Sequence, residues 1–246
     1  MMAGNDTPTE LSCLVEDIQP LNADIHRAWL KPLSGFFPAY LAGQYLQVIL
    51  ETGQRCAFSI ASAPADKQEN LELHIQKVKG NDNSAQLFKE LTEGRVRISM
   101  PKGNCFLPTP LPDKPLLFIA AGTGFAQIKS MVDHCLAKHH AQKLHLYWGA
   151  RTPTDFYLPH LPIQWATRGL IYHPVVSNAS TEDDWCGRHG LLYEAVLADR
   201  QKIHNAEIYL SGSPAMVYTT IDVMVEAGFS EKHLHSDVFD YSPRKP

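Results

Sequence analysis

The sequence predicts two domains: an antiparallel β-barrel followed by an α/β domain built on a parallel sheet. Short apolar runs separated by Gly, Pro and Asn turns fill residues 11–110, a rhythm typical of a small barrel or sandwich. A proline-rich segment, residues 107–112, then ends this pattern. Beyond it, buried strands alternate with longer helices, which indicates a parallel sheet with helices on both faces.

These patterns set the expected boundaries. We expect residues 1–10, which are polar, to be disordered, residues 11–110 to form the barrel domain, and residues 113–246 to form the α/β domain. A chain of 246 residues is long enough for two packed units.

The barrel half is expected to contain six strands and one helix. The expected strands cover residues 11–18, 25–30, 45–50, 57–61, 71–75 and 96–98. Asn83 has the character of a helix N-cap, with Gln86 as the reciprocating amide three residues later. This pair predicts a helix over residues 85–91.

The second half is expected to alternate strands and helices. The expected strands cover residues 116–121, 144–148, 170–176, 208–210 and 234–239, and the expected helices cover 125–138, 191–197 and 214–227, the last stopped by Gly228. Ligands of such folds bind beyond the carboxyl ends of the strands, so the loops there are the first place to look for a site.

Composition excludes several function classes. A formal charge of −4 offers no basic surface for nucleic acid. No apolar run approaches the ~20 residues that span a bilayer, and the N-terminus lacks an export signal, so we expect a cytoplasmic protein with no membrane span. Five widely spaced cysteines and 12 histidines show no disulfide, zinc or iron–sulfur spacing, so no metal is expected.

A glycine turn follows the strand at 116–121. Gly122, Thr123 and Gly124 lead directly into a helix that starts at Phe125. Glycines leave room for a pyrophosphate, and the N–H groups and dipole of the helix start attract its charge. Gln127 occupies the position where a strict Gly-x-Gly-x-x-Gly fingerprint requires glycine, and a plain strand-to-helix turn remains the alternative.

A second turn of the same kind ends the strand at 208–210. Ser211 and Gly212 precede Ser213, a good N-cap, and Pro214, which suits the first helical position. Two such turns on neighbouring strand ends predict a cleft. Ser211 is equally consistent with a buried hydroxyl that the backbone satisfies.

Two arginines are further candidates for this cleft. Arg188, in a glycine-containing loop, is placed to pair with cofactor phosphate or ribose, or else to be a surface arginine. Arg151 follows the strand at 144–148 and is expected to border an adenosine pocket.

These turns, in this order behind a barrel, resemble the ferredoxin-NADP reductase superfamily, and most closely its bacterial NAD(P)H-flavin reductases. The resemblance covers residues 11–241 and implies FAD or FMN, bound or as substrate, together with NADH and/or NADPH. The family's Arg-x-Tyr/Phe-Ser strand is matched by Phe58, Ser59, Ile60 and Ala61. It implies that Ser59 lies near flavin N5 and Phe58 near the ribityl chain.

The family arginine is displaced in this chain. It should stand two residues before the aromatic, where this sequence has Cys56, and Arg55 lies one position earlier. A one-residue shift turns a strand side chain to the opposite face, so Arg55 can replace it only if the strand bulges or bends.

Other matches extend the implied flavin and nicotinamide sites. The resemblance places His74, Ile75 and Gln76 near the flavin ring, Ser84 near a flavin phosphate, Ser211 and Met216 near nicotinamide, and Phe239 or Tyr241 over one flavin face. His74 as a structural histidine and Phe239 as core packing are equally consistent with the sequence.

Together these features predict an enzyme that transfers hydride from nicotinamide to flavin and so supplies reduced flavin. Ser59 and Ser211 are the catalytic candidates, as groups that position the two rings. Two alternatives stay open: a reductase with bound FAD that serves a separate ferredoxin or oxygenase protein, and a non-catalytic flavin- or nucleotide-binding module. Acidic residues 182–184, after the strand at 170–176, favour NADH or dual use.

Overall fold

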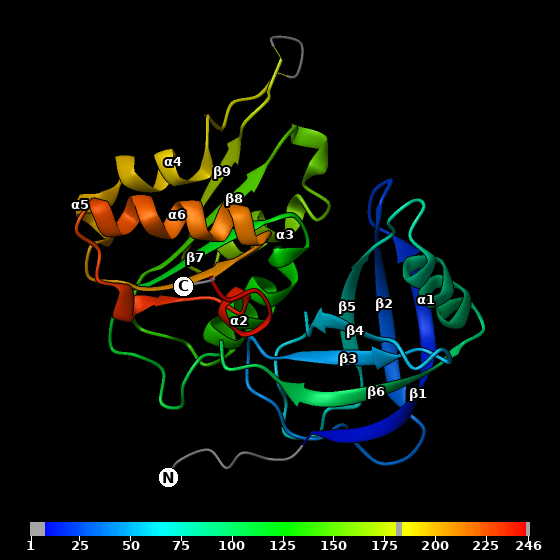
Figure 1. Ribbon diagram of the computed structural model, residues 1–246. Helices are drawn as coiled ribbons and strands as arrows, with labels where there is room; N and C mark the ends of the chain where they lie inside the picture. The colour runs from blue at the N-terminus through cyan, green and yellow to red at the C-terminus, as the bar shows by residue number, and fades with distance from the viewer. Residues whose placement is uncertain (1–7, 181–183, 245–246) are drawn as a thin grey trace.

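The computed structural model describes residues 8–180 and 184–244 and contains two sheets, one for each half of the chain (Figure 1). Sheet A is antiparallel and has the strand order β4-β3-β6-β1-β2-β5. Its elements are β1 (Thr9–Pro20), β2 (Ile25–Pro32), β3 (Tyr45–Ile49), β4 (Arg55–Ser59), β5 (Leu71–Gln76), α1 (Asp82–Thr92) and β6 (Arg95–Lys102).

Sheet A curls into a nearly closed barrel. A bridge between Ile60 and Leu73 brings the end of β4 to β5, the strand at the other edge of the sheet. The inward side chains alternate along each strand, as in Leu46 and Val48 of β3, and form one core that α1 covers with Leu87, Phe88 and Leu91. The antiparallel barrel that the sequence predicts is confirmed.

Sheet B is fully parallel, with the order β10-β9-β8-β7-β11-β12. Its elements are β7 (Leu116–Ala121), α2 (Phe125–Ala137), β8 (Leu144–Ala150), α3 (His160–Ala166), β9 (Leu170–Val176), β10 (Arg188–His189), α4 (Leu192–Ala198), α5 (Arg200–Ile203), β11 (Glu207–Ser211), α6 (Pro214–Glu226), β12 (Leu234–His235) and α7 (Val238–Tyr241).

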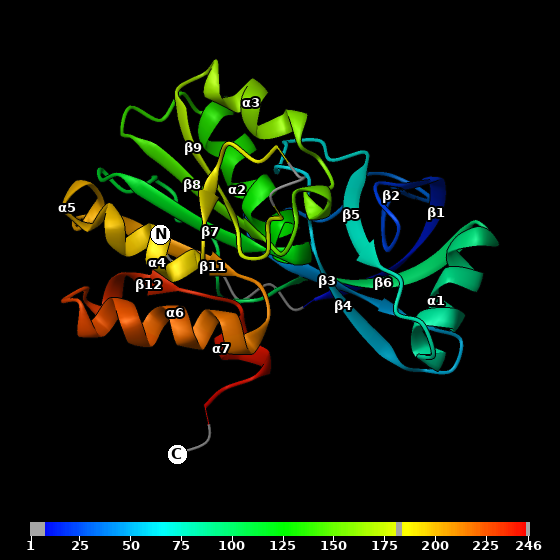
Figure 2. The same ribbon diagram turned by 90° about the horizontal axis from the view of Figure 1, so that it is seen from above.

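Helices cover both faces of sheet B (Figure 2). Alternation along β7 sends Phe118 toward α2 and α3, and sends Leu117 and Ile119 toward α4 and α6. The predicted α/β architecture is therefore confirmed.

Several elements differ from their predicted bounds. Asn81, not Asn83, caps α1, because its Oδ1 accepts a hydrogen bond of 2.9 Å from the Ser84 backbone N–H. The strand expected at 234–239 is wrong beyond His235: the Ser236 hydroxyl accepts from the Val238 N–H, and the chain turns into α7. The short elements α3, α5 and β10 were not expected at all.

The predicted disorder of residues 1–10 is also wrong in its last part. Thr9 and Glu10 belong to β1, paired with Met100 and Ser99 of β6. Residues 1–7 lie outside the described residues. Across residues 8–180 and 184–244, no helix combines the length and the apolar character needed to cross a membrane.

Candidate active site

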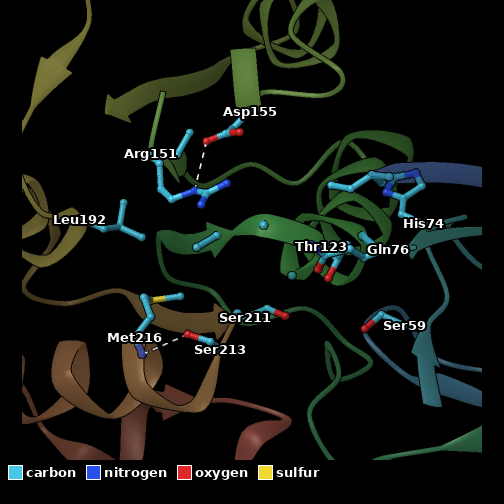
Figure 3. A pocket seen from close by; sticks show the side chains of 18 of the residues that line it. Ser59, His74, Gln76, Thr123, Arg151, Asp155, Leu192, Ser211, Ser213 and Met216 are labelled. Atoms are coloured by element: carbon cyan, nitrogen blue, oxygen red, sulfur yellow. Dashed lines mark hydrogen bonds and ion pairs between the residues drawn. The ribbon is translucent and has the colours of Figure 1, made fainter. Parts of the chain in front are cut away.

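A cavity of about 890 Å³ lies between the two sheets, beyond the carboxyl ends of β7, β8 and β11. Among its lining residues, the barrel side contributes Tyr45, Gln47, Ala57, Phe58, Ser59, His74 and Gln76, and the α/β side contributes Gly122, Thr123, Gly124, Arg151, Asp155, Ser211, Gly212, Ser213, Met216, Asp237 and Tyr241. Figure 3 shows Ser59, His74 and Gln76 on one side of this space and Arg151, Ser211 and Met216 on the other. Both halves of the predicted site therefore meet in one cavity.

The first glycine turn has the shape that a pyrophosphate requires. Gly122 has φ +53°, and a side chain added there would meet nothing within 4 Å, so the space in front of it is open. No side chain caps the start of α2, where the Phe125 N–H donates to the Gly122 carbonyl, so the positive end of the helix dipole faces this space without a side chain in front of it. These residues fit the phosphates of a dinucleotide.

Gly124 serves a different purpose from Gly122. A Cβ on Gly124 would lie 2.3 Å from the Ser211 carbonyl oxygen and 2.6 Å from the Gly212 nitrogen. The glycine therefore lets the two turns touch backbone to backbone. Ser211 is buried at that junction, with one side facing the cavity.

The second turn forms as the sequence predicts. The Ser213 hydroxyl accepts a hydrogen bond of 3.4 Å from the Met216 backbone N–H, and Pro214 occupies the first turn of α6. Ser213 is therefore confirmed as an N-cap. Met216 folds back over Gly212 and lines the cavity beside Ser211.

Strand β4 carries Phe58 and Ser59 to the cavity but takes Arg55 away from it. Its register with β3 is regular from Tyr45–Ser59 to Ile49–Arg55, without a bulge. The Arg55 guanidinium instead donates to Glu10 Oε1 at 2.6 Å on the open surface. The bend that would let Arg55 take the place of the family arginine does not form.

Three neighbours of the cavity-lining residues of β4 and β5 are buried in the barrel. Ile60, Ala61 and Ile75, which the resemblance placed beside the flavin, are fully buried and do not line the cavity. Ile75 alternates with His74 and Gln76 on β5 and takes the inward face. Ile60 and Ala61 follow the end of β4 and pair with Leu73 and Glu72 of β5, where the barrel closes.

His74 lies at the cavity wall with both ring nitrogens engaged by the protein. Nε2 is 3.0 Å from Glu72 Oε1, and Nδ1 is 3.0 Å from the Tyr157 hydroxyl. Burial lowers the pKa of His74 and outweighs the opposing hydrogen bond from Glu72, so the ring is neutral. Nε2–H then donates to Glu72 and Nδ1 accepts from Tyr157, and because the side chain is fully buried it offers no free polar atom to a ligand.

Glu72 remains ionised beneath His74. Burial alone would raise the pKa of its carboxyl, but the hydrogen bond with His74 and the charge of Lys129 outweigh that cost and lower the pKa to about 2. The Lys129 ammonium lies 2.8 Å from Glu72 Oε2 and belongs to the other half of the chain.

Ser84 and Arg188 do not reach the cavity. The Ser84 hydroxyl accepts from the Val78 N–H, and its own N–H is capped by Asn81, so its polar groups hold the start of α1. Arg188 bonds to Asp199 and to the Ala195 carbonyl. It ties β10 to the end of α4 and leaves no guanidinium facing the cavity.

Two aromatic candidates also turn elsewhere. Phe125 stacks on Trp148 in the core, with ring centroids 3.6 Å apart, so only its backbone borders the glycine turn. Phe239 is 41% exposed and lies beside Tyr218. Tyr241, the alternative aromatic at the chain end, lines the cavity and donates weakly to the Gly212 carbonyl at 3.4 Å.

Asp237 is a cavity residue that sequence reasoning missed. Its Oδ1 is buried and has no hydrogen-bond partner in the described part of the chain. Burial, with a smaller contribution from the Asp240 charge, raises the pKa of Asp237 to about 6. In the sequence, Asp237 and Asp240 both lie close to Phe239, and nothing local distinguishes one carboxylate from the other.

Arg151 and Asp155 form a charged pair on the α/β side of the cavity. Arg151 Nε lies 3.5 Å from Asp155 Oδ2, and the same carboxylate accepts from the Thr152 N–H at 3.1 Å. Arg151 is largely exposed. Figure 3 marks its contact with Asp155 by a dashed line.

Comparison with known proteins gives this geometry its context. Residues 118–221 match the model of the oxidoreductase NAD-binding domain. The chain is 34% identical, over 82% of its own length and 86% of the relative's, to an NAD(P)H-flavin reductase of Vibrio harveyi. The chain belongs to the NAD(P)H-flavin reductase family. It is therefore an oxidoreductase with flavin and nicotinamide as its redox partners, and the interpretation as a non-catalytic module is set aside.

Other similarities connect this flavin reductase to electron-transfer proteins. It is 34% identical, over 92% of its length and 68% of the relative's, to the CDP-6-deoxy-L-threo-D-glycero-4-hexulose-3-dehydrase reductase of Yersinia pestis. A solved Amycolatopsis cytochrome P450 reductase matches with a TM-score of 0.84 and 28% identity, over 94% of this chain and 69% of that one.

Proposed function

We propose that this flavin reductase takes flavin as an exchangeable substrate and reduces it with nicotinamide held by the two glycine turns. The barrel side of the cavity supports this. Among its described lining residues, none is Lys or Arg, and Arg55 is already paired with Glu10. A flavin phosphate would find no cation there, so the isoalloxazine and ribityl groups would supply the binding contacts.

When bound, nicotinamide and flavin supply the hydride donor and acceptor. The described residues contribute orientation. We assign Phe58 and Ser59 to the flavin ring, with the Ser59 hydroxyl at the ring edge. We assign Ser211, with Met216 packed beside it, to the nicotinamide. The cavity places Ser59 and Ser211 on opposite walls, as two rings in contact would require.

Asp237 adds a proton site to this arrangement. Its unpartnered Oδ1 is buried at the cavity wall, and its pKa of about 6 keeps the carboxyl partly protonated in mildly acidic solution. We propose that it exchanges a proton with the flavin site, which needs one proton besides the hydride for full reduction.

For the nicotinamide, we propose NADH as the preferred form, with NADPH accepted more weakly. Asp155 already pairs with Arg151, the only Lys or Arg among the described residues that line the cavity. A 2′-phosphate near this pair would therefore meet the Asp155 carboxylate beside the Arg151 guanidinium. Asp184 is described and exposed, whereas the other acidic residues behind this expectation, Glu182 and Asp183, lie outside the described residues.

The deciding experiment measures NADH and NADPH oxidation with riboflavin, FMN and FAD, after bound flavin has been quantified in the purified protein. We expect little bound flavin. We also expect kcat/KM values for riboflavin and FMN within roughly tenfold of each other, because a charge-assisted phosphate contact would contribute about 1.5–3 kcal/mol. No oxidation with any flavin would contradict the proposal.

The second candidate is a reductase that keeps FAD and passes electrons to a protein. The likeness to the Yersinia pestis and Amycolatopsis reductases favours it. Stoichiometric flavin retained through gel filtration, with slow turnover on added riboflavin, would support this candidate over the first.

We also propose that the protein works in the cytoplasm. All five cysteines lie among the described residues and are free thiols, with Cys13, Cys105 and Cys135 buried. Activity that cofractionates with the soluble reducing compartment would agree with this location.

A further inference from the structure

Helix α2 presents polar side chains to the barrel. Gln127 Nε2 donates to the Gly43 carbonyl at 2.8 Å, and the Ser130 hydroxyl donates to the Ser62 carbonyl at 2.7 Å. Lys129, between them, reaches Glu72 Oε2 at 2.8 Å and the Ala61 carbonyl at 3.3 Å. These contacts dock the α/β half of the chain on the barrel.

The ion pair between Lys129 and Glu72 differs from the other docking contacts because it joins two opposite charges that are both largely shielded from solvent. The side chains of Lys129 and Glu72 are 12% and 4% exposed. Asp133, one helical turn further along α2, also contacts Lys129 at 3.1 Å and accepts from the Trp165 indole at 2.9 Å. A buried charge pair holds a narrow range of geometries, because separation leaves each charge without solvent.

The same ion pair is connected to the cavity on both sides. On the barrel, Glu72 binds His74, and His74 and Gln76 line the cavity on the same strand, β5. On the α/β half, Lys129 lies just beyond the first turn of α2, which begins at the glycine turn 122–124. Strand β5 packs against this glycine turn.

We propose that Lys129 is a positioning residue for hydride transfer. Through its buried contact with Glu72, it holds the glycine turn in register with the cavity-lining side chains of β5. Neither residue touches the reacting groups. Their contact sets the separation between the nucleotide half and the flavin half of the cavity. This role rests on the proposed hydride transfer between the two halves.

The test is Lys129→Met, which keeps the length of the side chain and removes its charge. We expect kcat to fall on the order of tenfold to a hundredfold, because misplacement by about 1 Å is costly to a hydride transfer. The KM values for NADH and riboflavin should change much less, since each half keeps its own binding residues. The primary isotope effect with NADH deuterated at C4 should rise, as the chemical step becomes slower.

Two further variants separate positioning from folding. Lys129→Arg should recover a large part of kcat, because it restores the charge pair. The double variant Glu72→Gln/Lys129→Met leaves no unpaired buried carboxylate at position 72. If its thermal midpoint is near that of the wild type, it should still show the low kcat and the raised isotope effect.

Lys114→Met is the matched control, because it breaks the Lys114–Glu207 pair inside the α/β half, away from the cavity. It should leave kcat and the isotope effect unchanged. Unchanged kcat and isotope effect in both Lys129→Met and the double variant would overturn the positioning role. If the wild type itself fails to oxidise NADH with riboflavin, the proposed function fails instead.

Discussion

Asp237 illustrates how one buried carboxyl couples pH to stability. Its folded-state pKa of about 6 lies above the ordinary value of 3.8, so its contribution to stability is fully present below pH ~4 and is lost as the pH rises through 6. Asp237→Asn removes the ionisable group, and with it the loss of stability at higher pH. We expect it to stabilise the protein by about 1–3 kcal/mol at pH 8 and to have little effect near pH 4.

Thermal unfolding of both proteins across pH 4–8 measures this difference. A stabilisation by Asp237→Asn that stays constant over the whole range would contradict an elevated pKa. If the proton role also holds, flavin reduction by the variant should lose its pH dependence near 6.

Asp155 is the residue at which nicotinamide preference should change. Asp155→Asn keeps an oxygen for the Thr152 N–H and frees Arg151 from its carboxylate. We expect kcat/KM for NADPH to rise about two- to fivefold relative to NADH, because an exposed ion pair of this kind is worth at most ~1 kcal/mol.

Steady-state kinetics with both nicotinamides at low ionic strength provide the measurement. Repeating them at high salt gives the control, since screening should shrink the gain. An equal change for NADH and NADPH would place the 2′-phosphate away from Arg151.

At the level of single residues, the sequence indicated backbone roles better than side-chain partners. Ser213 and Gly122 were predictable because N-caps and positive φ angles have local signals. Arg55 and Arg188 were not, because their partners are set by tertiary structure. Glu10 lies 45 positions from Arg55 in the sequence. Asp199, at the C-terminal end of α4, lies 11 positions from Arg188.

The contact between the two glycine turns is a property of elements, and Gly124 is its critical point. Gly124→Ala would place Cβ 2.3 Å from the Ser211 carbonyl oxygen, so one turn must move. We expect a loss of about 1–3 kcal/mol in stability, as for other overpacked sites, and a raised KM for NADH.

Gly169→Ala is the control for this variant. Gly169 has φ +100° with open space around it and lies in the turn between α3 and β9, so its substitution strains the backbone without a clash at the site. It should lower the unfolding midpoint and leave the KM for NADH unchanged. If both variants raise that KM equally, the contact between the turns has no specific role.

Long elements were predictable and short ones were not. The apolar run of β7 and the helical period of α6 are strong local patterns. Helix α3 contains Pro162 and spans seven residues, and β10 has two residues that exist as a strand only through β9. Residues 234–239 were expected as one strand, but only Leu234 and His235 pair with β11, and the Ser236 hydroxyl accepts from the Val238 N–H where α7 begins.

The whole molecule explains why the dinucleotide fingerprint is incomplete. In a domain that stands alone, the third glycine allows a helix to pack closely on its own sheet. Here that position faces a second domain, and Gln127 uses it to donate to the carbonyls of Gly43 and Cys105. The feature that separated this sequence from the usual fingerprint is therefore a docking contact between the two halves.

Gln127→Gly restores the fingerprint, and we expect it to lower the free energy of unfolding. It removes the hydrogen bonds to the Gly43 carbonyl of the barrel and to the Cys105 carbonyl of the connecting segment, and it places glycine inside α2, for an expected loss of about 2–3 kcal/mol in stability. Because the loss falls on the interface, we expect calorimetry to show a broader transition. Proteolysis should cut faster within residues 103–115, which join the two sheets.

Gln127→Ala separates docking from helix propensity, since alanine favours a helix and still lacks the amide. Gln127 Oε1 is buried and finds no partner among residues 8–180 and 184–244, which offsets part of the gain from the two donated bonds. Gln127→Ala should therefore lose less stability than Gln127→Gly. It should still be cleaved faster than the wild type within residues 103–115. If both variants are cleaved at the same rate as the wild type, Lys129 and Ser130 dock the two halves without Gln127.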